Sequence, residues 1–409
     1  MRHVIIGTSA AGLAAAEMVR RLAPGDAVAL ISDEPHLPYS RPLLTYLLGG
    51  EITPEKIWLR PRDYFERFGF EAHLGEPVVQ VDPEGRAVHL ASGRTVPYDR
   101  LLVASGANPR VPEIPGTDLG CVFTLRHLAD WRRLEAELPA GGPVVVVGMG
   151  AVGLKAADAF RQRGYEVHVL ARGAQALSKV LDPTAAGLLH DAVTALGIRV
   201  HYHAWPTALK GANGRVAQVV LNDGRELSAA AVLFSVGVEP RVDFLAGAGL
   251  AGPDGVPVDR TLRTGHPNIY AAGDCVLPHH LLTGKPAAFH IWPAAVAQGE
   301  VAGANMAGAG RVYDGILPMN SISLKTIRII TGGHQYPDGP HGEVFAHLDG
   351  RTGHYRRLVM DDGRLVGVTL VGDVAHAGIY FRIMARKLPL RDLPADPRTP
   401  DFQPGRLWA

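Results

Sequence analysis

Short apolar runs that end at small residues are the most regular pattern in the first half of the chain. The run His3–Ile6 ends at Gly7 and is followed by an alanine-rich segment, which predicts a strand, a tight turn and a helix. A second copy occurs at Val144–Val147, where the turn Gly148–Gly153 has a cleaner glycine spacing. The repeated pattern predicts an α/β fold with two dinucleotide-binding domains.

Other apolar runs predict the remaining elements of these two domains. The predicted strands are Ala27–Ile31, Val78–Asp82, Ala87–Leu90, Leu101–Ala104, Val167–Leu170, Ala231–Gly237 and Asn268–Asp274. Helices are predicted over Val152–Arg163 and over Pro293–Met306, where a proline stands in the first turn. Two prolines in Leu37–Leu44 predict a stiff loop that is not a regular helix.

The pattern changes at Tyr313 to short alternating strands. Arg357–Met360 and Leu365–Leu370 are the clearest of these, and an apolar helix is predicted near Ile379–Arg386. We expect a separate α+β domain here, followed by an irregular proline-rich tail from Pro394.

Composition narrows the class of protein. The chain has 409 residues, of which 47% are hydrophobic and 20% charged, and its net charge is +1, so nothing favours a nucleic-acid partner. No apolar run suggests a membrane span, and a strand directly after Met1 leaves no room for a signal peptide. Two cysteines exclude a disulfide scaffold and indicate a reducing cytoplasm.

The glycine turns carry the first candidate chemistry. A strand, turn and helix of this kind binds a pyrophosphate on the amide groups of the helix N-terminus. Gly7 makes the turn, Ser9 takes the place of the usual middle glycine, and Gly12 allows helix and strand to pack closely. Such turns also occur without a ligand, but recurrence of the turn favours two dinucleotides, a tightly held flavin and an exchanging nicotinamide.

An acidic pair follows the second strand. Asp33 and Glu34 stand about 20 residues after Gly12, where a carboxylate binds an adenosine ribose. The alternative is a solvated charged loop.

Four motifs in fixed order carry a resemblance to a known family. Gly7–Gly12, Ala104–Pro109, Gly148–Gly153 and Asn268–Asp274 together resemble the FAD-dependent pyridine nucleotide-disulfide oxidoreductase superfamily over nearly the whole chain. Pro38–Leu43 and Phe123–Arg126 are most similar to NAD(P)H-dependent rubredoxin and ferredoxin reductases and to the flavin module of NAD(P)H nitrite reductases.

The resemblance implies a domain organisation. Two Rossmann-like domains are expected, with a discontinuous FAD-binding domain at residues 1–115 and 240–312 and an NAD(P)H-binding domain at 116–239. Residues 313–409 would form the C-terminal α+β interface domain.

The resemblance also implies the site residues. Asp274 would accept a hydrogen bond from the ribityl chain of FAD, and Trp292 would lie near the pyrimidine edge of the flavin at a helix N-terminus. Pro42 and Lys155 are the candidate catalytic positions. The implied FAD contacts are Gly7, Ser9, Ala10, Ala11, Gly12, Asp33, Glu34, Arg41, Pro42, Val78, Ser105, Gly106, Arg126, Asp274, Cys275 and Trp292. The implied NAD(P)H contacts are Gly148, Gly150, Ala151, Val152, Gly153, Ala171, Arg172, Lys179 and Gly237.

The chain departs from the family at its thiols. The loop Ser40–Thr45 has no cysteine where disulfide-reducing members and peroxidases carry theirs. We expect structural roles for Cys121 and Cys275. Electrons should therefore leave the flavin without passing through a protein thiol.

Two further departures concern the nicotinamide. Lys155 replaces the glutamate that the family usually has two residues after Gly153, and its charge would raise the flavin potential. Alternatively, Lys155 pairs with an acid such as Asp158 or extends into solvent. After the strand Val167–Leu170 the chain has Arg172 instead of a carboxylate, which favours NADPH over NADH unless Arg172 is an ordinary surface residue.

These observations predict an FAD-dependent NAD(P)H oxidoreductase of the cytoplasm. The nicotinamide would deliver hydride to the flavin, and a small redox protein such as rubredoxin or ferredoxin would take the electrons. The alternatives are an NAD(P)H oxidase or peroxidase and a non-catalytic sensor of NAD(P)H. His201, His203, His279 and His280 are not spaced as metal ligands. The oligomeric state stays open, with a homodimer as one option.

Overall fold

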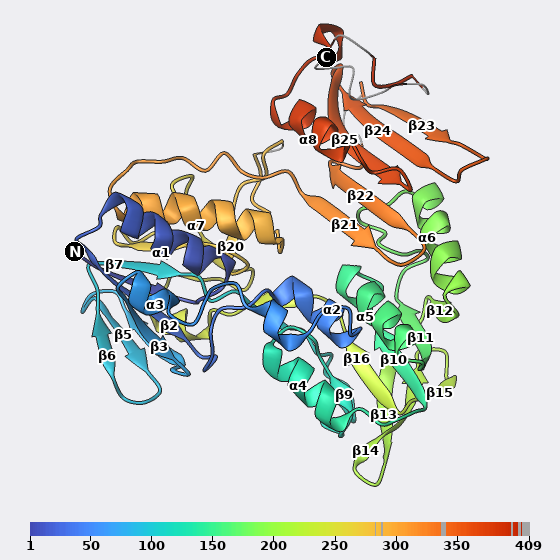
Figure 1. Ribbon diagram of the computed structural model, residues 1–409, viewed down its shortest axis with the longest axis horizontal. Helices are drawn as coiled ribbons and strands as arrows, with labels where there is room; N and C mark the ends of the chain where they lie inside the picture. Colours follow the sequence, from blue (N-terminus) through green and yellow to red (C-terminus); the bar gives the residue numbers. More distant parts are fainter. Residues whose placement is uncertain (283, 288, 337–340, 394–395, 400–401, 403–409) are drawn as a thin grey trace. The chain divides into compact units, whose positions relative to one another are not determined.

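The computed structural model describes residues 1–282, 284–287, 289–336, 341–393, 396–399 and 402. Contacts divide the chain into two units (Figure 1). The first unit comprises Met1–Leu43, Thr53–Asn108 and Val238–Ile316, and the second comprises Leu44–Ile52, Pro109–Gly237 and Leu317–Ala409. The predicted domain limits remain predictions, and the structure groups most of residues 116–239 and 313–409 in one unit.

The first unit is built on a five-stranded parallel sheet. In spatial order its strands are β19 (Ile269–Ala271), β7 (Arg100–Val103), β1 (Arg2–Ile6), β2 (Ala27–Ser32) and β3 (Phe70–Leu74). Val4 and Ile6 of β1 pack into one core cluster, whereas Ile5 packs into another. Because this strand is buried on both faces, its residues Val4–Ile6 are all apolar.

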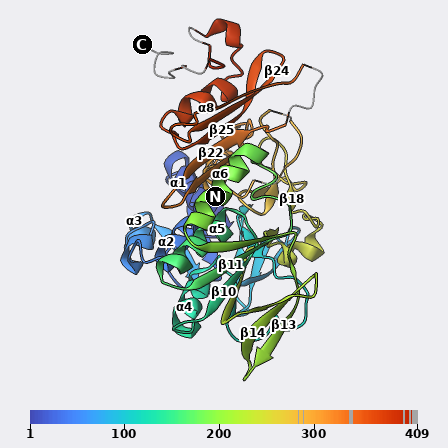
Figure 2. The same ribbon diagram turned by 90° about the vertical axis from the view of Figure 1, so that its right-hand side faces the viewer.

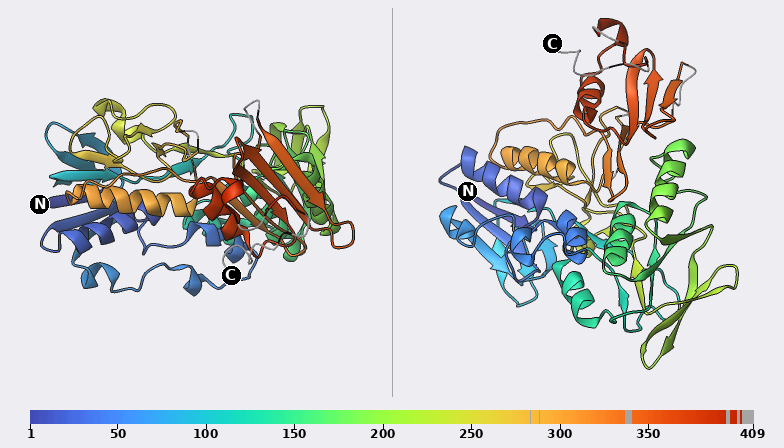
Figure 3. Two further views of the ribbon diagram at one scale, coloured as in Figure 1. Left: turned by 90° about the horizontal axis from the view of Figure 1, so that it is seen from above. Right: turned by 45° about the vertical axis from the view of Figure 1, so that its right-hand side comes forward.

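Helices α1 (Ala10–Leu22) and α7 (Trp292–Met306) lie side by side in the first unit (Figures 1 and 3). Small residues allow this contact. A Cβ atom on Gly299 would lie 2.2 Å from the Ala11 carbonyl oxygen, and one on Gly303 would lie 2.4 Å from that of Ala15. Only glycine permits the two backbones to approach so closely.

Smaller elements complete the first unit. An antiparallel sheet contains β4 (Val78–Asp82), β5 (Ala87–Leu90) and β6 (Thr95–Pro97). The remaining elements are η1 (Arg41–Leu43), η2 (Pro54–Ile57), α3 (Tyr64–Arg67), η3 (Asp243–Ala248), β18 (Val256–Pro257) and β20 (Val276–Leu277). Strands β8 (Ala107–Pro109) and β17 (Val238–Pro240) pair where the chain passes between the units.

The second unit repeats the parallel design. Its five-stranded sheet contains, in spatial order, β12 (Ile198–Tyr202), β11 (Glu166–Ala171), β10 (Pro143–Val147), β16 (Ala231–Phe234) and β9 (Val122–Phe123). The helices around this sheet are α2 (Leu44–Leu48), α4 (Leu128–Glu137), α5 (Ala151–Gln162) and α6 (Pro183–Ala195). An antiparallel sheet is formed by β13 (Pro206–Ala212), β14 (Arg215–Leu221) and β15 (Glu226–Ser228).

The second unit also contains a five-stranded antiparallel sheet. In spatial order it comprises β21 (Met319–Ser323), β22 (Arg328–Gly333), β25 (Arg364–Val371), β24 (Tyr355–Asp361) and β23 (Glu343–Leu348). Helix α8 (Ala377–Ala385) packs on β22 and β25 (Figure 2), and η4 spans Leu390–Asp392. The Tyr355 hydroxyl donates to Asp182 at 2.8 Å, which ties this sheet to the start of α6.

The expected α/β fold with parallel sheets is confirmed. One local prediction is partly wrong, because α2 already begins at Leu44, at the end of the predicted loop. The tail predicted from Pro394 lies largely outside the described residues. Within the described part of the chain, no helix is long and apolar enough to cross a bilayer.

Candidate functional site

The first glycine turn joins β1 to α1 with no space for larger residues. Gly7 has φ of +113°, and a Cβ atom there would lie 2.1 Å from the carbonyl oxygen of Ala104. A Cβ atom on Gly12 would lie 1.9 Å from the carbonyl oxygen of Gly7. The backbone therefore forms a tight cradle of the kind that receives a pyrophosphate.

The N-terminus of α1 fits an anionic ligand. Among the described residues, the N-cap Ser9 makes no capping hydrogen bond with its side chain, and the first turn contains no acidic residue. The first amide groups of a helix lack partners within the helix and carry its partial positive charge. The turn thus meets the requirement of the FAD pyrophosphate.

Strand order brings three predicted positions to one edge of the first sheet. Gly7, Ser105 and Asp274 lie just beyond the carboxyl ends of β1, β7 and β19, which are neighbouring parallel strands. Ser105 Oγ donates to the Arg241 carbonyl oxygen at 2.6 Å. Ligands of open parallel sheets bind at this edge.

The loop before Asp274 is anchored by helix α7. The amide of Gly273, which has φ of +89°, donates to Oε1 of the buried Gln298 at 2.7 Å. This contact fixes the turn that presents the half-buried Asp274.

A pocket beside the first turn brings Glu34 close to Ser9 and Arg41. Glu34 accepts hydrogen bonds from the Tyr39 hydroxyl at 2.7 Å and from Arg41 Nη2 at 2.5 Å. Asp33 instead pairs with Arg241 Nη1 at 2.5 Å. Of the two predicted acids, Glu34 is therefore the one that lines the pocket with the turn.

Both cysteines are buried free thiols. Cys275 is 0% exposed, its Sγ lies 3.4 Å from the Ala272 carbonyl oxygen, and burial raises the pKa of its thiol. Cys121 is 1% exposed and its Sγ lies 3.5 Å from the Glu137 carbonyl oxygen. A redox-active thiol is an accessible thiolate, and neither residue has that environment.

The second glycine turn has nearly the same backbone geometry as the first. Gly148 has φ of +109°, and a Cβ atom there would lie 2.2 Å from the Ser235 carbonyl oxygen. On Gly153 it would lie 2.1 Å from the carbonyl oxygen of Gly148. Gly150 caps α5, whose first turn, within the described residues, also contains no acidic side chain. This turn fits a second dinucleotide.

Arg172 lies just after β11, beside an exposed aromatic ring. Its guanidinium carbon is 5.6 Å from the centroid of Trp205, which is 40% exposed. The amide of Ala204 donates to the Ala171 carbonyl oxygen at 3.1 Å, which holds the two segments together. Lys179 is also exposed in the same unit. Nothing in the sequence pattern indicated the Trp205 contact.

Lys155 lies on α5 and contacts Tyr46 of α2. Its ammonium donates to the Tyr46 hydroxyl and lies 4.0 Å from the ring centroid. Among the described residues Lys155 forms no ion pair with Asp158, although its charge acts to lower the pKa of that carboxyl group; Asp158 accepts a hydrogen bond from Gln162 Nε2 at 3.2 Å. The sequence analysis did not indicate this contact between Tyr46 and the predicted position Lys155.

The remaining predicted residues are distributed over both units. Val78 opens β4, Pro42 is exposed in η1, and Trp292 is the first residue of α7. Arg126 lies in the second unit, where its amide donates to Asp130 at 2.8 Å. Gly237 has φ of +108° and lies after β16.

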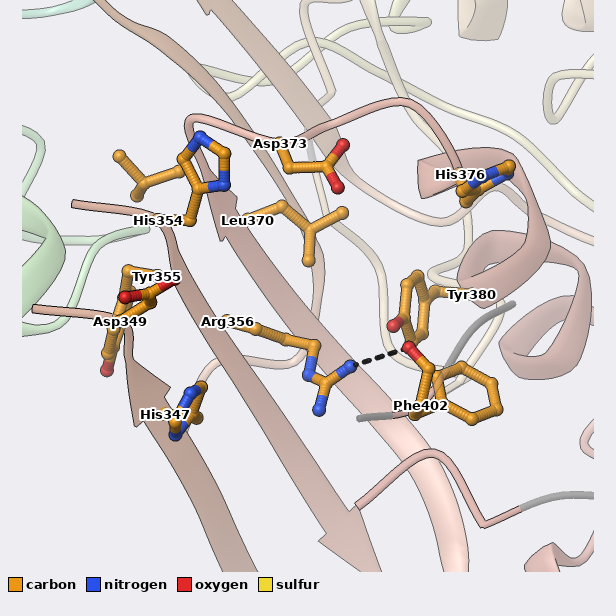
Figure 4. A pocket seen from close by; sticks show the side chains of 11 residues that line it. His347, Asp349, His354, Tyr355, Arg356, Leu370, Asp373, His376, Tyr380 and Phe402 are labelled. Atoms are coloured by element: carbon orange, nitrogen blue, oxygen red, sulfur yellow. Dashed lines mark hydrogen bonds between the residues drawn. The ribbon is translucent and has the colours of Figure 1, made fainter. Parts of the chain in front are cut away.

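A second pocket lies on the five-stranded antiparallel sheet of the second unit, and none of the predicted site residues lines it (Figure 4). Arg356 points across it toward Phe402, with Nη1 3.4 Å from the Phe402 carbonyl oxygen. Its guanidinium also lies 5.8 Å from the Phe402 ring centroid. Arg356 therefore fastens Phe402 to the sheet. Within the described chain, no group of three or more His, Cys, Asp or Glu residues could hold a metal ion.

The sequence of the chain is similar to those of known proteins. Residues 1–299 match the family described as pyridine nucleotide-disulphide oxidoreductase. The chain is 30% identical to the NADH-dependent phenylglyoxylate dehydrogenase subunit epsilon of Aromatoleum evansii, over 96% of this chain and 93% of that protein. It is 31% identical to a rubredoxin-NAD(+) reductase of Pseudomonas putida, over 75% of this chain and 80% of that protein.

The fold is also similar to that of a solved structure. The ferredoxin reductase for the CYP199A2 system of Rhodopseudomonas palustris is 31% identical and superposes with a TM-score of 0.86. The match covers 92% of this chain and 93% of that one.

Proposed function

The chain belongs to the pyridine nucleotide-disulphide oxidoreductase family, and on that basis we propose that its electron acceptor is a small iron–sulfur protein of the rubredoxin or ferredoxin type. The protein is an FAD-dependent NAD(P)H:acceptor oxidoreductase. One observation carries the proposal about the acceptor: both cysteines are buried, and the loop Ser40–Thr45 has no thiol. Electrons would therefore pass from the flavin to an external carrier without a protein thiol as an intermediate.

We assign FAD to the first unit. Its amide groups at the start of α1 would bind the pyrophosphate, and Glu34 would accept hydrogen bonds from the adenosine ribose. Asp274 would accept from a ribityl hydroxyl. Bound FAD supplies the chemistry, because it accepts hydride from NAD(P)H and passes electrons on singly. Trp292 and the positive end of α7 would lie against the flavin ring.

We assign NAD(P)H to the second unit, at the turn Gly148–Gly153. Arg172 would bind a 2′-phosphate through a two-pronged contact, which favours NADPH. The named relatives in A. evansii and P. putida use NADH or NAD(+), so the residue pattern and those names point to different coenzymes. Lys155 would place a positive charge near the nicotinamide. We further assign the protein to a reducing cytoplasm, because both cysteines are free.

The acceptor is tested by rapid mixing. Enzyme reduced anaerobically with one equivalent of NADPH is mixed with oxidised rubredoxin, with a [2Fe–2S] ferredoxin, or with oxygen-saturated buffer. We expect at least one iron–sulfur protein to reoxidise the enzyme much faster than oxygen does. Faster reoxidation by oxygen would instead identify an oxidase, and slow reoxidation by every acceptor would identify a sensor. A folded but colourless protein would refute FAD binding altogether.

A further inference from the structure

The contact between Lys155 and Tyr46 joins two helices of the second unit. Helix α2 packs along α5, since Leu48 accepts a hydrogen bond from Arg163 Nη1 at 3.4 Å. A Cβ atom on Gly49 would lie 3.4 Å from the Cβ atom of Ala159. This packing holds the half-buried Tyr46 over Lys155, so that its hydroxyl accepts from the ammonium.

The partner of this ammonium is neutral. A phenol accepts a hydrogen bond but does not cancel the positive charge, as a carboxylate would. Among the described residues, Tyr46 Oη is the one hydrogen-bond acceptor of Lys155 Nζ. Asp158 is engaged by Gln162, and burial raises the pKa of its carboxyl group. The charges of Lys325 and Lys155 both act on Asp158 and oppose this rise in its pKa, whereas the hydrogen bond of the Lys155 ammonium goes to Tyr46.

Lys155 lies near the start of α5, shortly after the glycine turn. Helix α5 begins at Ala151, one turn before Lys155. Side chains on a helix lean toward its N-terminus, so that a lysine covers the turn that precedes it. The partial positive charge of the helix N-terminus has the same sign. Both charges therefore act on a ligand at Gly148–Gly153.

We propose that Tyr46 is a positioning residue that holds the Lys155 ammonium in place, so that the coenzyme site binds reduced nicotinamide more tightly than oxidised nicotinamide. The dihydronicotinamide ring is neutral, whereas the oxidised ring carries a positive charge. A fixed ammonium nearby repels the oxidised ring only, which weakens product binding after hydride has left. This inference rests on the assignment of NAD(P)H to the second turn.

The experiment compares two ligands with the same adenosine half. NADP⁺ has a cationic ring, and 1,4,5,6-tetrahydro-NADP has a neutral reduced ring that donates no hydride. Their dissociation constants are measured by titration calorimetry on the FAD-loaded enzyme, and the measurement is repeated with the NAD pair. The repulsion of one fixed charge in a partly solvated site corresponds to a preference of about tenfold for the neutral ring.

Substitutions at both positions separate the two parts of the proposal. Lys155→Gln should bring the ratio of the two dissociation constants close to one, and Lys155→Glu should favour NADP⁺. Tyr46→Phe keeps the ring but removes the acceptor, so its ratio should fall between those of the wild type and Lys155→Gln. Lys210→Gln is the matched control, because Lys210 pairs with Glu226 on the exposed β13–β15 sheet. Its ratio should equal that of the wild type.

Each contrary result has a distinct meaning. A wild-type ratio in Lys155→Gln would overturn the role of the charge. A wild-type ratio in Tyr46→Phe, with Lys155→Gln altered, would overturn the positioning role of Tyr46. If neither ligand binds the wild type, the coenzyme assignment itself has failed. Flavin absorbance and the melting temperature of each variant show that it is folded and loaded.

Discussion

At the scale of single residues, Asp274 has the most local role in the proposed FAD site. Because it would accept from a ribityl hydroxyl, Asp274→Ala should leave that hydroxyl unpartnered and weaken FAD retention by about 1–3 kcal/mol. The measurement is the dissociation constant of FAD after reconstitution of the apoprotein. Asp254→Ala is the control, because Asp254 is exposed in the same unit. Equal FAD affinities in the two variants would remove Asp274 from the site.

The second prediction at this scale concerns Arg172 and the preference for NADPH over NADH. A guanidinium binds a 2′-phosphate through two charge-assisted hydrogen bonds, whereas a ribose hydroxyl gains little from it. Arg172→Ala should therefore lower kcat/KM for NADPH relative to NADH by about ten- to hundredfold. Lys179→Ala should have a smaller effect, and so should Trp205→Leu, because Trp205 supports the guanidinium.

The comparison of coenzymes needs fixed ionic strength, since salt screens an exposed charge. Arg225→Ala is a suitable control, because Arg225 pairs with Asp223 at 2.7 Å on the surface of the same unit. If the wild type prefers NADH and Arg172→Ala alters neither coenzyme, Arg172 is an ordinary surface residue.

At the scale of elements, the contact between α1 and α7 depends on the absence of side chains. Gly303→Ala would force a Cβ atom against the backbone of Ala15 and should destabilise the protein by about 1–3 kcal/mol. Gly187→Ala is the matched control, because Gly187 lies within α6 and its added Cβ atom would meet nothing within 4 Å. It should raise stability by about 0.5–1 kcal/mol. The melting temperature should therefore fall in Gly303→Ala and rise in Gly187→Ala, which thermal unfolding measures.

The strands and helices that are bounded by glycine turns could be predicted from the sequence. Short elements whose position depends on packing against distant parts of the chain could not. Strands Val78–Asp82 and Ala87–Leu90 have the predicted limits, and α7 begins one residue before the predicted Pro293. Helix α2 was missed because five residues are too few to show a helical period. Tyr46 was missed for a different reason, because its contact with Lys155 spans 109 residues of sequence.

At the scale of the whole molecule, each unit carries its own copy of the same backbone cradle. In the first unit Gly12 approaches Gly7, and in the second Gly153 approaches Gly148, at nearly equal distances. The sequence revealed both copies because close backbone contact admits only glycine. The glycine spacing does not reveal which copy takes which dinucleotide. That assignment depends on neighbouring side chains, such as Glu34 and Arg172.

Each unit also carries a histidine whose burial couples stability to pH. His3 is 0% exposed, and burial lowers its pKa from 6.5, although its hydrogen bond to Asp26 at 2.8 Å opposes the shift. Burial likewise lowers the pKa of His201, whose ring stacks on His168 with a centroid distance of 5.2 Å. Both histidines therefore bind a proton less readily in the folded protein than in the unfolded chain.

The sign of the pH dependence follows from proton binding. Below pH 6.5 and above the folded pKa, the unfolded chain binds more protons than the folded protein, so the free energy of unfolding falls as the pH is lowered. Each unit of pKa difference between the two states is worth about 1.4 kcal/mol. Urea unfolding between pH 5 and 7.5 should show this loss. Replacing either histidine, in His3→Gln or in His201→Gln, should make the free energy of unfolding depend less steeply on pH. A free energy of unfolding that stays constant across this range in the wild type would contradict the lowered pKa of both histidines.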